Sequence, residues 1–227
     1  MIPLTSLEYS AIALSLKVAV TATLLSLPFG FAAAYVMTYR PFRGRVALDV
    51  LINLPLTLPP VVIGYLLLLL LGRRGWLGGL LESIGVRRIF TWKAAVIATA
   101  VVGFPLLVRA IRISMEAIDE GLIQASRTLG AGWFDAMLTV ILPLSLRGIV
   151  AGSALMFARG LGEFGATVIV AGNIPGVTQT IPLAIYDYAG APGGDASAIT
   201  LCLVSVSITV AVLILHEWLG RKLVRRD

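Results

Sequence analysis

Long runs of apolar residues constrain this chain more than any other feature of its sequence. Five runs are long enough for transmembrane helices, each of which needs about 20 apolar residues; they cover residues 9–39, 46–71, 94–112, 146–171 and 198–219. Only 13% of the 227 residues are charged, whereas an average soluble domain has about 25%. The sequence therefore predicts an all-α fold, a polytopic membrane helix bundle of about five transmembrane helices that forms one domain over residues 1–227.

The distribution of basic residues predicts the orientation of these spans, because cytoplasmic loops carry an excess of Lys and Arg. With the N-terminus outside and the C-terminus cytoplasmic, five basic residues lie on the outer side and eleven on the inner side. The outer residues, which oppose the rule, are Arg73, Arg74, Arg87, Arg88 and Lys93. The inner residues are Arg40, Arg43, Arg45, Arg109, Arg112, Arg127, Arg147, Arg221, Lys222, Arg225 and Arg226. We assign the net charge of +6 to an anionic membrane surface and not to nucleic acid.

Three prolines interrupt the second apolar run within six residues: Pro55, Pro59 and Pro60. Each removes a backbone N–H donor and obstructs a carbonyl one turn earlier. Irregular backbone at membrane depth needs protein or a water-filled cavity around it, so we expect a broken or bent helix that lines a path. The alternative is a kinked helix that only packs against its neighbours.

The fourth run carries two ionisable residues, Arg159 and Glu163, four positions apart and so on one face of a helix. Each costs about 2.5–3.5 kcal/mol at the centre of a span, and we expect both to face the protein interior and to satisfy each other. The nearby glycines 160, 162 and 165 permit close approach of a neighbouring helix. A structural ion pair and a gating role are both open.

The stretch 113–145 is the one long interior segment that we do not assign to a transmembrane span. It begins with polar and acidic residues, and two helix-compatible pieces follow that are interrupted at Gly130 and Gly132. A short amphipathic helix that ends at a glycine suits a docking site for a soluble partner. An interfacial helix that lies on lipid is the alternative.

This segment resembles the cytoplasmic loop of the permease subunits of ABC importers. That loop reads Glu-Ala-Ala, three residues, Gly, nine residues, Ile, one residue, Leu-Pro. The matching positions keep the full spacing and are Gln124, Ala125, Ser126, Gly130, Val140, Leu142 and Pro143. Gln124, Ser126 and Val140 depart from the pattern, and the first departure puts a salt bridge from that position in doubt.

Further stretches resemble the permease subunits of molybdate importers, within the molybdate/sulfate/tungstate permease family. The Pro-Pro-Val-Val-Ile-Gly-Tyr run at 59–65 and the compact length favour molybdate over sulfate or thiosulfate and over tungstate. The matching stretches are 15–18, 27–30, 58–65, 72–75, 104–112, 159–167, 173–176 and 180–182.

The resemblance implies a type I ABC importer permease fold in the cell inner membrane. It also implies a homodimer with a second copy of the permease, two ATPase subunits and an extracytoplasmic oxyanion-binding protein that delivers molybdate. No Gly-rich loop followed by Lys and Ser/Thr is present, so we expect no enzyme, no catalytic residues, no metal site and no cofactor in this chain, with ATP and Mg bound by the partner ATPase.

The resemblance also assigns roles to residues. It implies that the coupling loop docks on the ATPase through Gln124, Ala125, Ser126, Arg127, Thr128, Leu129, Gly130 and Pro143. We expect the path or gate for the oxyanion to include Pro55, Pro59, Pro60, Gly64, Arg159 and Glu163, with a weak, transient site made of hydroxyls and backbone groups.

A secondary transporter that works without an ATPase is the alternative of a different class. Such a protein needs relays of acidic or histidine side chains within its spans, but the single histidine, His216, lies near the end of the last apolar run. A membrane-embedded enzyme has no support, because the sequence shows no paired carboxylates, no metal-ligand spacing and no Ser/His/Asp set.

Overall fold

The computed structural model describes residues 4–72, 75 and 90–224, and in that part of the chain every regular element is a helix. The all-α prediction is confirmed. The predicted outer residues Arg73, Arg74, Arg87 and Arg88 lie outside the described residues, as do Arg225 and Arg226. The elements are α1 (Ser6–Tyr39), α2 (Arg45–Thr57), α3 (Pro60–Leu71), α5 (Trp92–Glu116), α6 (Glu120–Thr128), α7 (Trp133–Ala136), the π-helix η1 (Met137–Ile141), α8 (Leu142–Leu144), α9 (Leu146–Leu161), α10 (Gly165–Ala171), α11 (Ile181–Gly190) and α12 (Asp195–Val224).

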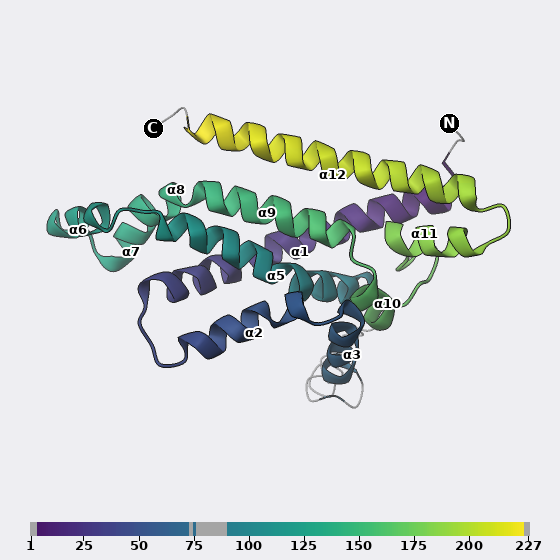
Figure 1. The fold of residues 1–227 in the computed structure, drawn as a ribbon, viewed down its shortest axis with the longest axis horizontal. Helices are drawn as coiled ribbons and strands as arrows, with labels where there is room; N and C mark the ends of the chain where they lie inside the picture. Colours follow the sequence, from purple (N-terminus) through teal and green to yellow (C-terminus); the bar gives the residue numbers. More distant parts are fainter. Residues whose placement is uncertain (1–3, 73–74, 76–89, 225–227) are drawn as a thin grey trace.

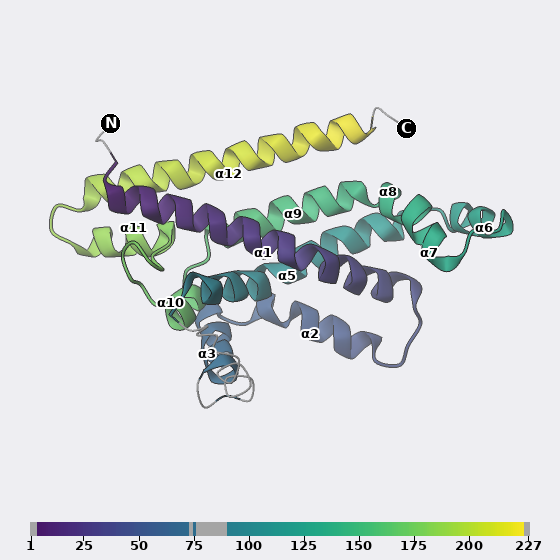
Figure 2. The same ribbon diagram turned by 180° about the vertical axis from the view of Figure 1, so that it is seen from behind.

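Three long helices, α1, α5 and α9, pack against one another as the centre of the bundle, and α12 lies along α9 (Figures 1 and 2). The helices α6 and α7 stand at one end of the elongated molecule, and α11 lies at the opposite end beside the start of α1. A capping box begins α1, because the Glu8 carboxylate accepts the Thr5 backbone N–H at 2.6 Å and the Thr5 hydroxyl accepts that of Glu8 at 3.3 Å.

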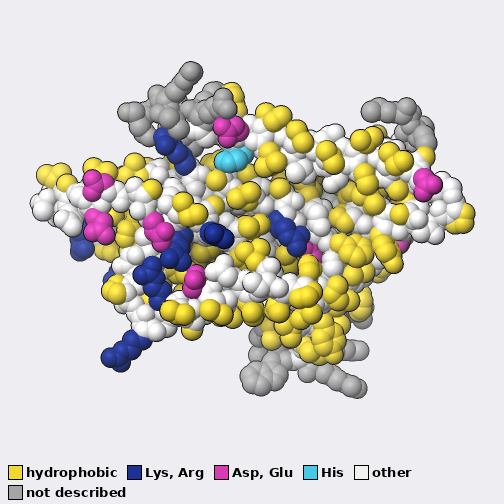
Figure 3. Space-filling view, in the orientation of Figure 1, with side chains coloured by type: hydrophobic (Ala, Val, Ile, Leu, Met, Phe, Trp, Pro, Cys, Tyr) yellow, Lys and Arg dark blue, Asp and Glu magenta, His cyan; other side chains and the backbone are white. Residues whose placement is uncertain are grey.

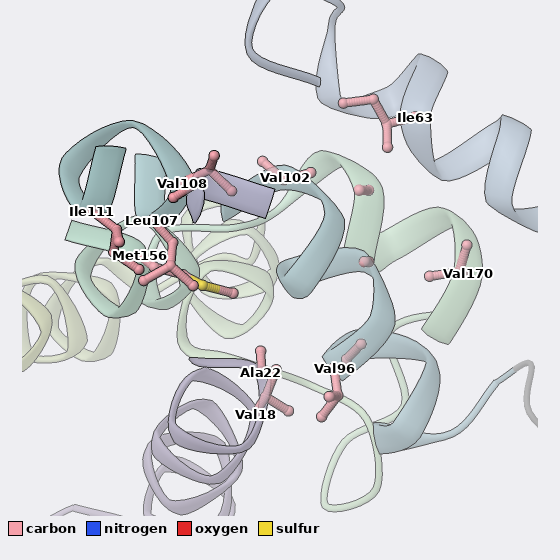
Figure 4. Close-up of a cluster of buried hydrophobic side chains, with 14 of the residues drawn as sticks. Val18, Ala22, Ile63, Val96, Val102, Leu107, Val108, Ile111, Met156 and Val170 are labelled. Carbon is pink, nitrogen blue, oxygen red and sulfur yellow. The ribbon is translucent and has the colours of Figure 1, made fainter. Parts of the chain in front are cut away.

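The buried core lies where these helices meet (Figure 4). Leu107 and Ile111 of α5 are fully buried beside Met156 of α9, and all three side chains point into one cluster. Small residues let the helices approach closely: a Cβ at Gly152 of α9 would lie 2.9 Å from the backbone oxygen of Leu107.

Three of the predicted spans correspond to unbroken helices and the second to a bent pair, whereas the fourth, 146–171, is divided between α9 and α10. The helix α1, the helix α5 and residues 195–218 of α12 are each long and apolar enough to cross a membrane. The pair α2 and α3 bends by 116°, and residues 133–144 bend by 63° against α9, so up to five spans result. The expected number of about five spans is reached when each bent pair is counted as one span, and the expected break in the second run lies at its three prolines.

One predicted span and one predicted connection are wrong in detail. The fourth apolar run, 146–171, is not one helix, since α9 ends at Leu161 and α10 begins at Gly165. The segment 172–196 lies between the last two apolar runs, where the sequence predicts a connecting loop with Gly and Pro, but it contains the ten-residue helix α11. Local composition hid this helix because Pro182, which reads as a helix breaker, occupies its first turn, where a missing N–H costs nothing.

Candidate functional site

The helix α6 is defined at both ends by local hydrogen bonds. At its start the Asp119 carboxylate accepts the backbone N–H of Gly121 at 2.8 Å. At its end Gly130 adopts φ +95, its N–H donates to the Arg127 carbonyl, and the Ala131 N–H donates to the Ser126 carbonyl, both at 3.1 Å. This is a Schellman motif, whose left-handed position is usually glycine. The motif glycine is therefore the residue that ends the helix.

The predicted docking residues cover a protruding, solvent-facing surface. Gln124, Ala125, Arg127 and Thr128 are exposed, whereas Ser126 is half-buried. The Leu129 side chain is 89% exposed and lies directly before the helix-ending glycine. Leu129 and the basic Arg127 are therefore both accessible to another protein. The structure thus brings these seven predicted residues, through Gly130, onto one exposed helix at the end of the molecule (Figure 1).

The Leu-Pro of the motif lies where the chain returns to the bundle. Residues Met137–Ile141 form a π-helix, and the Leu142 N–H bonds to the Met137 carbonyl five residues earlier. The exposed Pro143 comes next and has no N–H to donate. Such departures from α-helical geometry arise where an α-helical hydrogen bond is missing, and they recur at functional sites.

Aromatic side chains attach this loop to α1 and α5. The Trp133 indole N–H donates to the Tyr35 hydroxyl at 2.5 Å, and the two rings are 5.7 Å apart, edge to face. The Tyr39 hydroxyl donates to the Met115 carbonyl at 3.0 Å, and Arg40 lies 5.7 Å from the Trp133 ring. The sequence analysis missed these contacts, and their only signal was two tyrosines four residues apart before Arg40.

The two stretches predicted to form the path meet in the structure. Pro55 lies within α2, and Pro59 and Pro60 begin α3 after the bend. Gly64 of α3 is buried against α10, and a Cβ there would lie 2.9 Å from the Ala166 Cα. Glycine at 64 thus permits contact between the backbones of two short helices, each of which follows a break. Their role in a path stays a prediction.

Arg159 and Glu163 pair as predicted, but across a break and not along one helix. Gly162 ends α9, and Glu163 lies in the connection to α10. Glu163 is 2% exposed. Its Oε2 is 2.9 Å from the Arg159 Nη1, in ion-pair contact without the geometry of a hydrogen bond, and its Oε1 accepts the Ala166 N–H at 2.8 Å. One side chain therefore neutralises a cation and satisfies the first turn of α10.

Together, the bundle with two broken spans and an exposed loop helix at one end is the architecture of ABC importer permeases. In a solved structure of the MetNI methionine ABC transporter, described as inward-facing, one chain superposes with a TM-score of 0.75 at 16% identity over 96% of both chains. A family model described as "Binding-protein-dependent transport system inner membrane component" matches residues 26–225, and the chain belongs to this family.

Curated relatives extend the likeness to nearly the whole chain. The "Molybdenum transport system permease protein ModB" of Escherichia coli (strain K12) is 49% identical over 219 residues, 96% of both chains. The "Sulfate transport system permease protein CysW" of Synechococcus elongatus is 40% identical over 173 residues, 76% of this chain and 60% of that protein.

Proposed function

We propose that this chain is the permease subunit of an ATP-driven importer that moves molybdate across the inner membrane by alternating access. The observation that carries the proposal is the near-full-length identity to a molybdenum transport permease, which exceeds the likeness to the sulfate transport relative in both identity and coverage. Sulfate transport by the same fold is the second candidate, favoured by that sulfate relative.

In the proposed assembly two copies of the permease work with two ATPase subunits and an extracytoplasmic oxyanion-binding protein. The exposed surface of α6, with the adjacent Leu129, supports docking to an ATPase, which is expected to bind and hydrolyse ATP with Mg. The excess of basic residues supports a cytoplasmic position for this end, with the N-terminus outside and the C-terminus cytoplasmic.

Energy from the ATPase would reach the bundle through the contacts that hold this loop. The Trp133–Tyr35 hydrogen bond joins α7 to α1, and the Tyr39–Met115 bond joins α1 to α5. A displacement of the docked helix thus acts on the two central helices directly. Because packed interfaces are bistable and not continuously deformable, small shifts at this end can switch access at the broken spans.

Substrate competition in proteoliposomes tests the proposed cargo. The complex with its ATPase and binding protein should take up labelled molybdate only with ATP inside, and excess sulfate should leave uptake unchanged, whereas tungstate should compete. Sulfate that competes as strongly as unlabelled molybdate would refute the assignment of molybdate while leaving an oxyanion permease.

Charge reversal at Arg127 tests docking separately from cargo. Arg127→Glu changes an exposed residue of α6 and should reduce binding to the ATPase and uptake together, with unchanged insertion in the membrane. Arg43→Glu makes the same change in the exposed turn between α1 and α2 and serves as the matched control. Equal ATPase binding by both variants would rule out docking through this surface.

A further inference from the structure

A polar cavity of about 340 Å³ lies between α2 and α5, outside the path predicted from the sequence. Its lining includes the charged residues Asp49, Arg109 and Arg112 and the amide of Asn53, with Ile52 and Pro105 among the apolar walls. Figure 3 shows that the Lys, Arg, Asp and Glu side chains on this face gather over the half of the molecule that carries α6. The cavity belongs to that end, since Arg109 lies only seven residues, about 10 Å of helix, before the end of α5.

Helical spacing explains why these polar groups share one cavity. Asp49 and Asn53 are four residues apart on α2, and Arg109 and Arg112 are three apart on α5, so each pair occupies one face of its helix. The two faces oppose each other across the cavity, where Arg112 contacts Asp49 at 3.3 Å.

The two arginines of the cavity differ in whether they have an acidic partner. Arg112 is neutralised, because its Nη1 contacts Asp49 and its Nε donates to Glu116 at 2.7 Å. Asp49 also accepts the Asn53 side-chain amide at 3.1 Å. Among residues 4–72, 75 and 90–224, no carboxylate lies within ion-pair distance of Arg109, and its side chain is exposed to the cavity. One guanidinium therefore has five N–H donors without an acidic partner.

We propose that this cavity binds a tetrahedral oxyanion through Arg109, with the adjacent Arg112 as a second donor. The planar fork of a guanidinium matches two oxygens of such an anion and carries its charge at every physiological pH. The shared chemistry fits either molybdate or the phosphate of a lipid headgroup. The substrate is favoured, because both arginines line a cavity bounded by three helices, α1, α2 and α5.

Binding at this cavity is weak for a physical reason. Asp49 lines the same space with 46% of its side chain exposed, and its carboxylate repels an incoming dianion while the nearby cation attracts it. A weak site near the cytoplasmic end suits release into the cytoplasm. In this proposal, which rests on the proposed function, Arg109 and Arg112 are the last contacts of molybdate before its release.

Protection from thiol labelling tests whether the cavity binds the anion. The native Cys202 is exposed, so C202S provides a background without a reactive thiol, and I52C then places one at the cavity wall. In the complete complex in detergent, sodium molybdate should slow maleimide labelling of I52C about threefold or more. Arg109→Gln should abolish the protection, Arg109→Lys should retain part of it, and Arg43→Gln should retain all of it.

Uptake measurements separate this inference from the proposed function. In proteoliposomes Arg109→Gln should lower molybdate uptake about fivefold to tenfold, the loss expected for a charge-assisted hydrogen bond at a partly exposed site, while ATPase binding stays unchanged. Normal molybdate uptake by the unmodified complex without protection of I52C would overturn the cavity site and leave the proposed function intact. A defect of Arg109→Gln that appears only in bilayers of anionic lipid, again without protection in detergent, would assign Arg109 to a lipid phosphate. Failure of the unmodified complex to take up molybdate would overturn the proposed function itself.

Discussion

Replacement of Gly130 by alanine isolates the contribution of one backbone conformation to coupling. Glycine at φ +95 ends α6, and a Cβ built there meets no atom within 4 Å. The effect of Gly130→Ala is therefore confined to the backbone, since the new methyl group clashes with nothing. The left-handed conformation of a residue with a Cβ destabilises the folded turn by about 1–2 kcal/mol. The lower conformational entropy of the unfolded chain that contains alanine offsets about 0.4–1 kcal/mol of this cost.

The net cost is about 1 kcal/mol, which lowers the equilibrium ratio of closed to open Schellman turn about fivefold. Molybdate uptake per ATP hydrolysed should fall in proteoliposomes, by no more than this factor, because the docked helix then ends in several conformations. Hydrogen exchange of the Ala131 amide, which the turn protects through Ser126, should accelerate by the same factor. Exchange of the Ala131 amide reports on the turn itself, and uptake per ATP reports on coupling.

Two variants make this prediction refutable. Gly132→Ala places the same methyl group two residues away at φ −66, also with no atom within 4 Å, and should leave coupling almost unchanged. Gly130→Asn should restore much of the activity, because asparagine tolerates the left-handed region. If Gly130→Ala and Gly132→Ala behave alike, or if asparagine is no better than alanine, the backbone argument is wrong.

Three further changes test the loop attachment, the helix packing and the ion pair. Trp133→Phe keeps a ring but loses the hydrogen bond to Tyr35, worth about 0.5–1.5 kcal/mol; amide exchange in α6 and α7 should accelerate severalfold, and unchanged exchange would contradict the attachment. Gly148→Ala drives a Cβ into the backbone of α5 and should destabilise the bundle by about 1–3 kcal/mol, seen as a lower Tm in detergent; an unchanged Tm would show that α9 can shift freely. Glu163→Gln leaves Arg159 without its counter-charge and should cost on the order of 2–3 kcal/mol, below the value for fully buried pairs because that arginine is 32% exposed. Adding Arg159→Gln should recover most of the Tm, and no recovery would argue against the pair.

Patterns that are local in the sequence predicted three of the long helices and the break between α2 and α3. The apolar runs predicted α1, α5 and α12, and the three prolines predicted the break after α2, because span length and missing N–H donors act within a few residues. The interruptions at Gly130 and Gly132 matched the end of α6 and the start of α7. The ending of α9 at Gly162 was missed, since the surrounding residues are apolar enough to read as one continuous span.

The sequence by itself determined the class of fold, the long apolar helices and the exposed loop helix, because hydrophobic length, helix breakers and caps are properties of neighbouring residues. Only the tertiary structure decided which faces meet. Trp133 bonds to Tyr35 across 98 positions, and Arg112 pairs with Asp49 across 63. Such contacts depend on the rotation and crossing of whole helices, which the packing of Gly64, Gly148 and Gly152 against neighbouring backbones sets. A local pattern holds no information about that geometry, and for this reason the cavity between α2 and α5 could be found only in the folded molecule.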